Sequence, residues 1–151
     1  MAVEPGSVYE DDESIPDDEV VYRMILVSNT KWTETGAAER AGTNAFQDRP
    51  EADLEDLGVQ AVAVSVHLDS EMRARGVTAE DLVERWGEKY GVASILAGEA
   101  RSLGQGIVRW PTLNDPEHGM IFVKTGPKKT GGQSKQLAKR SKIVIAPSGP
   151  K

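Results

Sequence analysis

Hydrophobic and polar positions alternate most regularly in the stretch GVQAVAVSVHL, residues 58–68. One face of this stretch carries large apolar side chains, and the other carries Ala61, Ala63, Ser65 and His67. A period of two residues is typical of a β-strand. The second face holds no charged side chain, so we expect another element, such as a helix, to pack on it. The pattern therefore predicts a buried strand that ends at residue 68.

A helical period follows in TAEDLVERWGEKY, residues 78–90. Thr78 and Asp81 have the spacing of a capping box, with Asp in place of the usual Glu. Gly91 is a suitable residue after the end of the helix. The charged side chains, Arg85 among them, are expected to face water. The apolar stripe of this helix consists of Leu82, Val83, Trp86 and Tyr90.

Shorter apolar runs between glycines and prolines predict the rest of the fold, although residues 28–58 show no clear period. That region is expected to hold loops and short helical turns anchored by Trp32 and Phe46, and its length favours a role in covering a pocket. The predicted class is α+β, with a small mixed sheet packed by the helix at 78–90 and by short helices. The further predicted strands are 22–27, 92–96, 107–110, 120–123 and 142–146, and the further predicted helices are 98–103 and 133–141.

Charge is unevenly distributed along the 151 residues. The first 19 residues contain eight acids and no base, whereas residues 124–151 contain eight bases and no acid. An acidic segment with few large apolar side chains does not bury enough surface to order itself. We therefore expect a disordered acidic tail at 1–14, a single domain at 15–145 and a second disordered tail at 146–151.

Composition also limits the chemistry and the compartment. The chain has no cysteine and two histidines, which excludes disulfides and zinc–thiolate sites and leads us to expect no metal site. The acidic N-terminus lacks the features of a signal peptide, and every apolar run is shorter than the ~20 residues of a membrane span. A cytoplasmic protein that does not enter a membrane is expected.

The stretch DPEHGMIFV, residues 115–123, places a histidine where a turn enters a predicted strand. His118 at this position can act as an acid or base near neutral pH, or orient a substrate. Alternatively, it bonds a backbone carbonyl and only ends the turn. Glu117 is a second candidate, for which the alternative is a solvated loop carboxylate.

Two further candidates lie on predicted strands. Arg23 stands inside an apolar run, so it must be paired or face a cleft. It either contacts an anion, or pairs with the acids at 17–19, or extends its head to solvent. Ser65 shares a strand face with His67, and such a pair suggests nucleophilic catalysis. No Gly-x-Ser-x-Gly elbow is present, and a small residue beneath a helix explains Ser65 better.

Two glycine-containing stretches resemble phosphate-binding loops without matching one. GEARSLGQG, residues 98–106, has a G-x5-G-x-G spacing, and we interpret it as a helix end followed by a tight entry to a strand. GPKKTGGQSK, residues 126–135, has Gly132 where a Walker A loop requires lysine.

The basic C-terminal region is the strongest compositional signal. Its positive charge can bind nucleic-acid phosphates, or contact the acidic N-terminal tail of the same chain, or form an ordinary solvated face. The region has no aromatic side chain for base stacking. The candidate anion-binding or nucleic-acid-binding residues are Lys128, Lys129, Lys135, Lys139 and Arg140.

Several stretches together resemble a group of small bacterial proteins without an established activity. They are IPDDEVVYRMI, NAF, VSVHL, YGVASILAGEARSLGQGIV, PEHGMIFV and LAKRSKIV. Members tend to carry Asp-Asp-Glu before an apolar-Arg segment and Pro-x-His-Ala before a strand. Here Gly119 follows the histidine, so the second pattern is matched in part. This resemblance implies no catalytic residue.

The order of Arg23, Ser65 and Glu117 is similar to the order of Arg, Ser and Glu on the strands of ADP-ribosyltransferase-like folds. The resemblance implies NAD as a cofactor or substrate, with Arg23 on a diphosphate, Ser65 on a ribose and Glu117 stabilising positive charge on the ribose ring. His118 would assist. The match is an analogy of residue order.

Three functions therefore stay open. The first is a non-catalytic binding or regulatory component of a bacterial multi-protein system, such as a defence or toxin–antitoxin system, with a protein partner and no cofactor. The second is an NAD-using transferase or hydrolase. The third is nucleic-acid binding through the basic C-terminal region.

Overall fold

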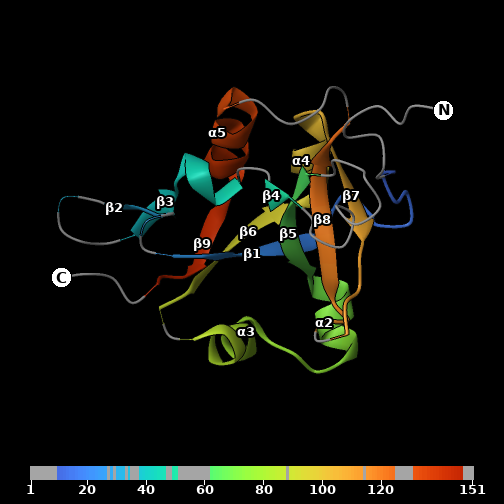
Figure 1. The fold of residues 1–151 in the computed structure, drawn as a ribbon, viewed down its shortest axis with the longest axis horizontal. Coiled ribbons are helices and arrows are strands. Elements are labelled where there is room, and N and C mark those ends of the chain that lie inside the picture. The colour runs from blue at the N-terminus through green and yellow to red at the C-terminus, as the bar shows by residue number, and fades with distance from the viewer. Residues whose placement is uncertain are drawn as a thin grey trace.

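The computed structural model has one sheet at its centre, with helices on both sides (Figure 1). Within the residues described, no helix is long and apolar enough to cross a membrane. The structure describes residues 10–26, 28, 30–32, 34, 38–46, 49–50, 62–87, 89–113, 115–124 and 131–147.

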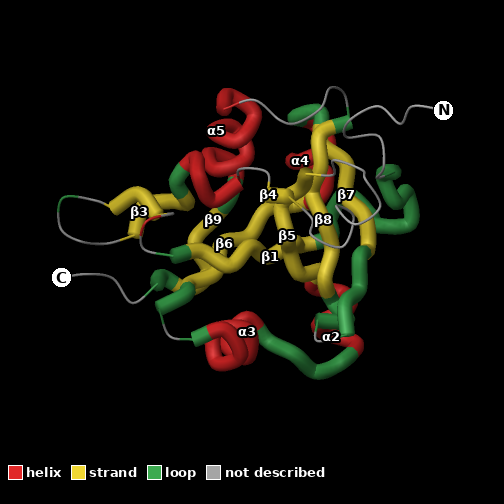
Figure 2. Tube along the Cα trace, viewed as in Figure 1, coloured by secondary structure: helices red, strands yellow, loops and turns green. Residues whose placement is uncertain are grey.

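The sheet has the strand order β7-β8-β5-β1-β6-β9, and β4, which is outside this order, pairs with β5 (Figure 2). Each of the pairings described is antiparallel, where the sequence predicted a mixed sheet. The α+β class is confirmed. The strands are β1 (Val20–Ile25), β4 (Arg49–Pro50), β5 (Val62–Leu68), β6 (Gly91–Leu96), β7 (Gln105–Arg109), β8 (His118–Val123) and β9 (Lys142–Ile145).

The described residues between 28 and 50 contain more regular structure than their polar sequence predicted. A hairpin of β2 (Thr30–Trp32) and β3 (Ala38–Ala41) is followed by the 3₁₀ helix η2 (Thr43–Phe46). Phe46 is fully buried, which confirms it as the anchor of this region. The side chain of Trp32 and residues 51–61 lie outside the described part of the chain.

In the described part of the chain, four helices flank the sheet: α2 (Asp69–Ala74), α3 (Ala79–Trp86), α4 (Ala97–Ser102) and α5 (Gly131–Arg140). The capping box that begins α3 is confirmed, because Thr78 accepts a hydrogen bond from the amide of Asp81 and the Asp81 carboxylate accepts one from the amide of Thr78. This helix ends at Trp86, earlier than predicted, because Gly87 follows with a φ of 118°.

The two faces of β5 meet different partners, as its alternating sequence requires. Val64, Val66 and Leu68 join the main core, which also includes buried residues of α4 and α5. The opposite face carries Ser65 and His67. On that side α2 and α3 pack on β1 and β6 through a smaller apolar cluster, and the two pairs of helices lie on opposite sides of the sheet (Figure 1).

Residues 10–14 are ordered, although the sequence predicted a disordered tail up to residue 14. The amide of Asp12 donates to the carbonyl of Ile107 at 2.7 Å, and the Asp11 carboxylate accepts from the amide of Ile107 at 2.8 Å. These bonds satisfy backbone groups of β7, the edge strand. Pro147, placed in the predicted C-terminal tail, is buried, and residues 1–9 and 148–151 lie outside the described part.

Candidate functional site

A pocket opens where β1 and β5 separate. Tyr22 pairs with His67, and beyond this pair the two strands diverge. The Arg23 guanidinium fills part of the gap, donating from Nε to the carbonyl of Ala45 at 2.7 Å and from Nη1 to the carbonyl of Ser65 at 3.0 Å. A charged donor therefore satisfies one carbonyl of η2 and one of β5.

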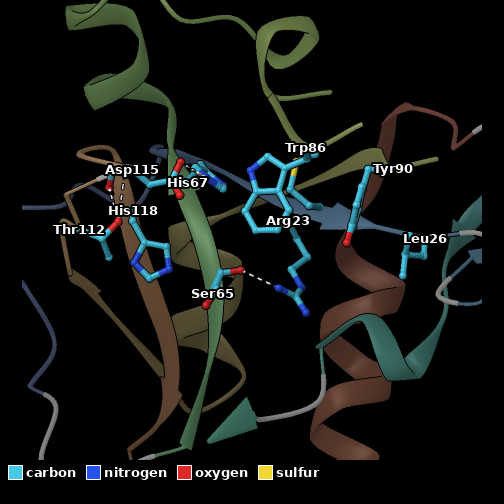
Figure 3. A pocket seen from close by; sticks show the side chains of 10 residues that line it. Arg23, Leu26, Ser65, His67, Trp86, Tyr90, Thr112, Asp115 and His118 are labelled. Atoms are coloured by element: carbon cyan, nitrogen blue, oxygen red, sulfur yellow. Dashed lines mark hydrogen bonds and ion pairs between the residues drawn. The ribbon is translucent and has the colours of Figure 1, made fainter. Parts of the chain in front are cut away.

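The pocket has a volume of about 310 Å³, which lies at the lower end of the range for small-molecule sites. Its walls come from β1, β5, the end of α3 and the turn before β8 (Figure 3). The lining residues are Arg23, Met24, Leu26, Ser65, His67, Trp86, Tyr90, Thr112, Asp115 and His118.

Two aromatic side chains form the wall on the α3 side. Trp86 is 42% exposed, and its ring stands edge-on to that of Tyr90, with 5.5 Å between the centroids. The Trp86 ring is also perpendicular to the imidazole of His67, with 6.2 Å between the centroids. The wall thus combines an open indole surface with a buried imidazole.

His118 at the opposite wall has a defined tautomer when it is neutral. Its Nδ1 lies 2.8 Å from the carbonyl of Trp110, and a carbonyl only accepts, so Nδ1 carries the proton. The Nε2 atom of the neutral ring is then an acceptor or base. His118 thus bonds a backbone carbonyl, as the second interpretation of the sequence expected, and it also lines the pocket. Its role as an acid, a base or a substrate contact stays a prediction.

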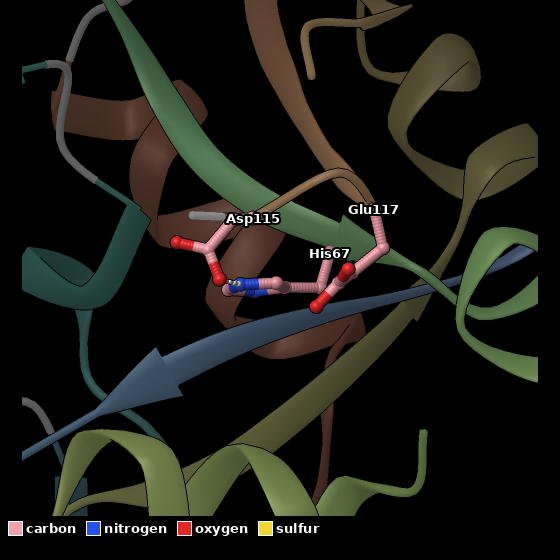
Figure 4. A group of neighbouring side chains, drawn as sticks. All are labelled: His67, Asp115 and Glu117. Atoms are coloured by element: carbon pink, nitrogen blue, oxygen red, sulfur yellow. Dashed lines mark ion pairs between the residues drawn. The ribbon is translucent and has the colours of Figure 1, made fainter. Parts of the chain in front are cut away.

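His67 lies between the carboxylates of Asp115 and Glu117 (Figure 4). Its side chain is 3% exposed, and its Nε2 is 3.6 Å from Asp115 Oδ1, which is longer than a hydrogen bond. Among the residues described, neither ring nitrogen of His67 has a hydrogen-bond partner. Burial lowers the pKa of His67, and His118 also lowers it, while Asp115 and Glu117 act in the opposite direction.

Arg85 joins the two carboxylates from the solvent side. Its Nη1 donates to Asp115 Oδ1 at 2.7 Å and also to Glu117 Oε1. The pKa of Arg85 is raised, mainly because of its hydrogen bond to Glu117, while burial acts to lower it. Glu117 is 1% exposed, and its Oε2 has no hydrogen-bond partner among the described residues. Arg85, expected to face water, is therefore the counter-ion of a buried carboxylate.

The structure brings three of the four predicted site residues to one pocket. Arg23, Ser65 and His118 all line it, whereas Glu117 turns behind His67 toward Arg85. Sequence reasoning missed Asp115 and Arg85, and considered His67 only as a partner of Ser65. One signal was present, because the quoted stretch DPEHG places two carboxylates next to His118.

The hydrogen-bond partners of the Arg23 and Ser65 side chains differ from those that the sequence suggested. Arg23 donates to carbonyls of η2 and β5. Among the acids at 17–19, Asp17 pairs with Arg101 and Glu19 accepts from the amide of Ser70. The Ser65 hydroxyl donates to Met120 Sδ at 3.9 Å, a weak bond across to β8.

The basic candidates fall in two groups. Lys135 and Lys139 are exposed on α5, and Arg140 pairs with Glu99 at 2.6 Å. Lys128 and Lys129 lie outside the described residues, so nucleic-acid binding stays a prediction. Asp11 and Asp12 pair with Arg101 and Arg109 rather than with the basic C-terminal region.

One group of side chains has the donor set of a metal site, although none was expected with two histidines in the chain. His67, Asp115 and Glu117 each offer one ligand atom, and these atoms lie within 4.8 Å of one another. An imidazole and two carboxylates are ligands that divalent transition metals accept.

Comparison of the chain with protein-family models, with curated proteins and with solved structures gives no match.

Proposed function

We propose that the protein binds a small molecule in the pocket between α3 and the sheet. The bound molecule has a flat unsaturated part against Trp86 and Tyr90, and a hydrogen-bonding group toward Ser65 and His118. In this proposal the protein is a non-catalytic binding component, located in the cytoplasm and working with a partner protein in a bacterial multi-protein system.

The observation that carries the proposal is the open indole of Trp86 beside polar groups that line the same pocket. Aromatic rings supply much of the binding surface of ligand pockets, and a few convergent polar groups fix the orientation of the ligand. Here the polar groups include His118 Nε2, which the bond from Nδ1 to Trp110 leaves facing away from the backbone.

Saturation-transfer NMR with nicotinamide, adenosine and NAD as probes tests this proposal. We expect at least one heteroaromatic probe to bind the wild type, and Trp86→Ala to weaken that binding by about tenfold, since a stacked ring contributes about 1 kcal/mol or more. The matched control is Val144→Ala on β9, a residue 45% exposed that does not line the pocket. Equal binding by wild type and Trp86→Ala, or no probe bound, would refute the proposal.

A second candidate function, an NAD-using enzyme, is supported by the presence of Arg23, Ser65 and His118 in one pocket. The role assigned to Glu117 fits less well, because Arg85 holds its carboxylate outside the pocket lining. Loss of NAD in the presence of the purified protein tests this candidate. His118→Gln should abolish such loss, and NAD left intact by the wild type would end it.

A further inference from the structure

We propose that His67, Asp115 and Glu117 bind one divalent transition-metal ion, which displaces the guanidinium of Arg85. Zn²⁺ and Mn²⁺ represent the class, because a nitrogen and two carboxylate oxygens suit such ions, and no thiolate is present to select softer ones. This inference rests on the side-chain cluster alone and does not depend on the proposed small-molecule ligand.

The distances require a modest rearrangement. The three ligand atoms lie within 4.8 Å of one another. Three ligands that each lie about 2.1 Å from one tetrahedral ion are about 3.4 Å apart. Side-chain rotations that shorten the separations by up to about 1.4 Å therefore place the three atoms around a common centre.

The cluster contains buried atoms that lack partners, which is the second argument for a ligand. Among the described residues, both nitrogens of His67 and Glu117 Oε2 are buried without a hydrogen bond. The two side chains are 3% and 1% exposed. A polar atom buried without a partner destabilises a fold by about 1–3 kcal/mol. A bound metal ion would take the lone pair of one His67 nitrogen and one from the Glu117 carboxylate, which removes the penalty at those two atoms.

Arg85 marks the position at which a cation interacts with both carboxylates of the cluster. Its Nη1 bridges Asp115 and Glu117, so one guanidinium neutralises part of the charge of two carboxylates. The Arg85 side chain is 35% exposed, and it can swing into solvent without opening the core. A divalent ion would balance both carboxylates, which one guanidinium does not.

The cluster also borders the pocket. His67 and Asp115 are both lining residues, so an ion held by three protein ligands would keep open coordination positions toward the pocket (Figures 3 and 4). In this proposal, the bound ion is accessible to water or to a small molecule that carries an oxygen donor.

Equilibrium dialysis of the metal-free full chain against Zn²⁺, and separately against Mn²⁺, tests the inference in the absence of any small-molecule probe. We expect one equivalent of at least one of these ions per chain, with affinity reduced by about 100-fold or more in His67→Gln and in Glu117→Gln. The matched control is Glu71→Gln, because Glu71 is also bound by arginines but lies outside the cluster, and its binding should equal that of the wild type.

A second variant keeps the test decisive if a ligand variant fails to fold. Arg85→Gln retains all three ligands and removes the competing cation, so it should bind the ion about tenfold more tightly than the wild type. Its melting temperature should rise on adding the ion by more than that of the wild type. Failure of both wild type and Arg85→Gln to bind either ion saturably, or equal binding by His67→Gln and wild type, would overturn the inference.

Discussion

Two charged clusters of this molecule use similar residue types in different ways. The acidic-edge cluster lies beside β7 and consists of Asp11, Asp12, Asp17, Glu71, Arg101 and Arg109. The pocket cluster consists of His67, Arg85, Asp115 and Glu117. Each member of the acidic-edge cluster takes part in an ion pair. In the pocket cluster, buried nitrogen and oxygen atoms lack partners among the described residues.

The difference distinguishes a structural role for the acidic-edge cluster from the binding role that we propose for the pocket cluster. Arg109 binds the carboxylates of Asp12 and Glu71 and the hydroxyl of Ser14, which ties the N-terminal segment to β7 and α2. Satisfied networks of this kind stabilise a fold. Unsatisfied buried polar groups are uncommon in folded proteins, and their position at the wall of a pocket supports the proposal that this cluster binds a ligand.

The largest effect is expected at the pocket cluster. Arg85→Ala leaves the buried carboxylate of Glu117 without a counter-ion and should lower the free energy of unfolding by about 2–4 kcal/mol. Urea denaturation measures this change. Arg85→Lys retains the positive charge and should lower the free energy of unfolding by clearly less. A loss below about 0.5 kcal/mol for Arg85→Ala would show that Glu117 does not depend on this ion pair.

A smaller effect is expected at the acidic-edge cluster. Arg109→Ala removes three contacts of partly exposed groups and should lower the free energy of unfolding by about 1–2 kcal/mol. The control is Arg75→Ala, which breaks one i,i+4 ion pair with Glu71. It should lower the free energy of unfolding by about 0.3–0.5 kcal/mol. Equal losses in the two variants would mean that the network adds nothing to its separate pairs.

The acidic-edge cluster should also depend on pH. The pKa of Asp12 is lowered mainly because Ser14 donates to it, and that of Glu71 mainly because Arg75 does. Carboxyls with a lowered pKa in the folded state contribute stability that is fully present above their unfolded pKa values, near pH 4, and is lost as pH falls. Asp12→Asn should therefore be less stable than the wild type at pH 7, and the gap should narrow toward pH 3. Urea denaturation across this range would contradict the account if the gap stayed constant.

The smallest effect on stability is expected on α5, which belongs to neither cluster. Lys135 and Lys139 are exposed, so changing both to Gln should alter the free energy of unfolding by less than about 0.5 kcal/mol. Under the nucleic-acid alternative, the same variant should weaken binding to a DNA duplex and reduce its dependence on salt. Duplex binding that does not change with salt would exclude a phosphate-driven contact.

Much of the fold could be predicted because its local patterns were strong. The alternation of residues 62–68, the capping box at Thr78 and the short apolar runs of β6, β7, β8 and β9 all correspond to observed elements. Helix α2 was missed because it follows β5 directly and buries a single residue, Met72. The β2–β3 hairpin was missed because its sequence is polar and lacks a two-residue period.

The site depended on tertiary contacts that no local pattern contains. Arg85 looked like a solvated residue of an amphipathic helix, and only the position of α3 beside the turn before β8 brings it to Glu117. His67 was placed correctly on the small face of a strand. Its carboxylate neighbours lie about fifty residues later in the chain, so their proximity could not be predicted from spacing.

The chain contains two histidines, so one spectrum can test the central claim that the pocket cluster is a ligand site. The measurement is the long-range ¹H–¹⁵N NMR spectrum of the histidine side chains, recorded before and after one equivalent of Zn²⁺. We expect a ring nitrogen of His67 to shift on coordination, while His118 keeps its proton on Nδ1. A His67 signal that is unchanged at saturating Zn²⁺ and also at saturating Mn²⁺ would contradict the account.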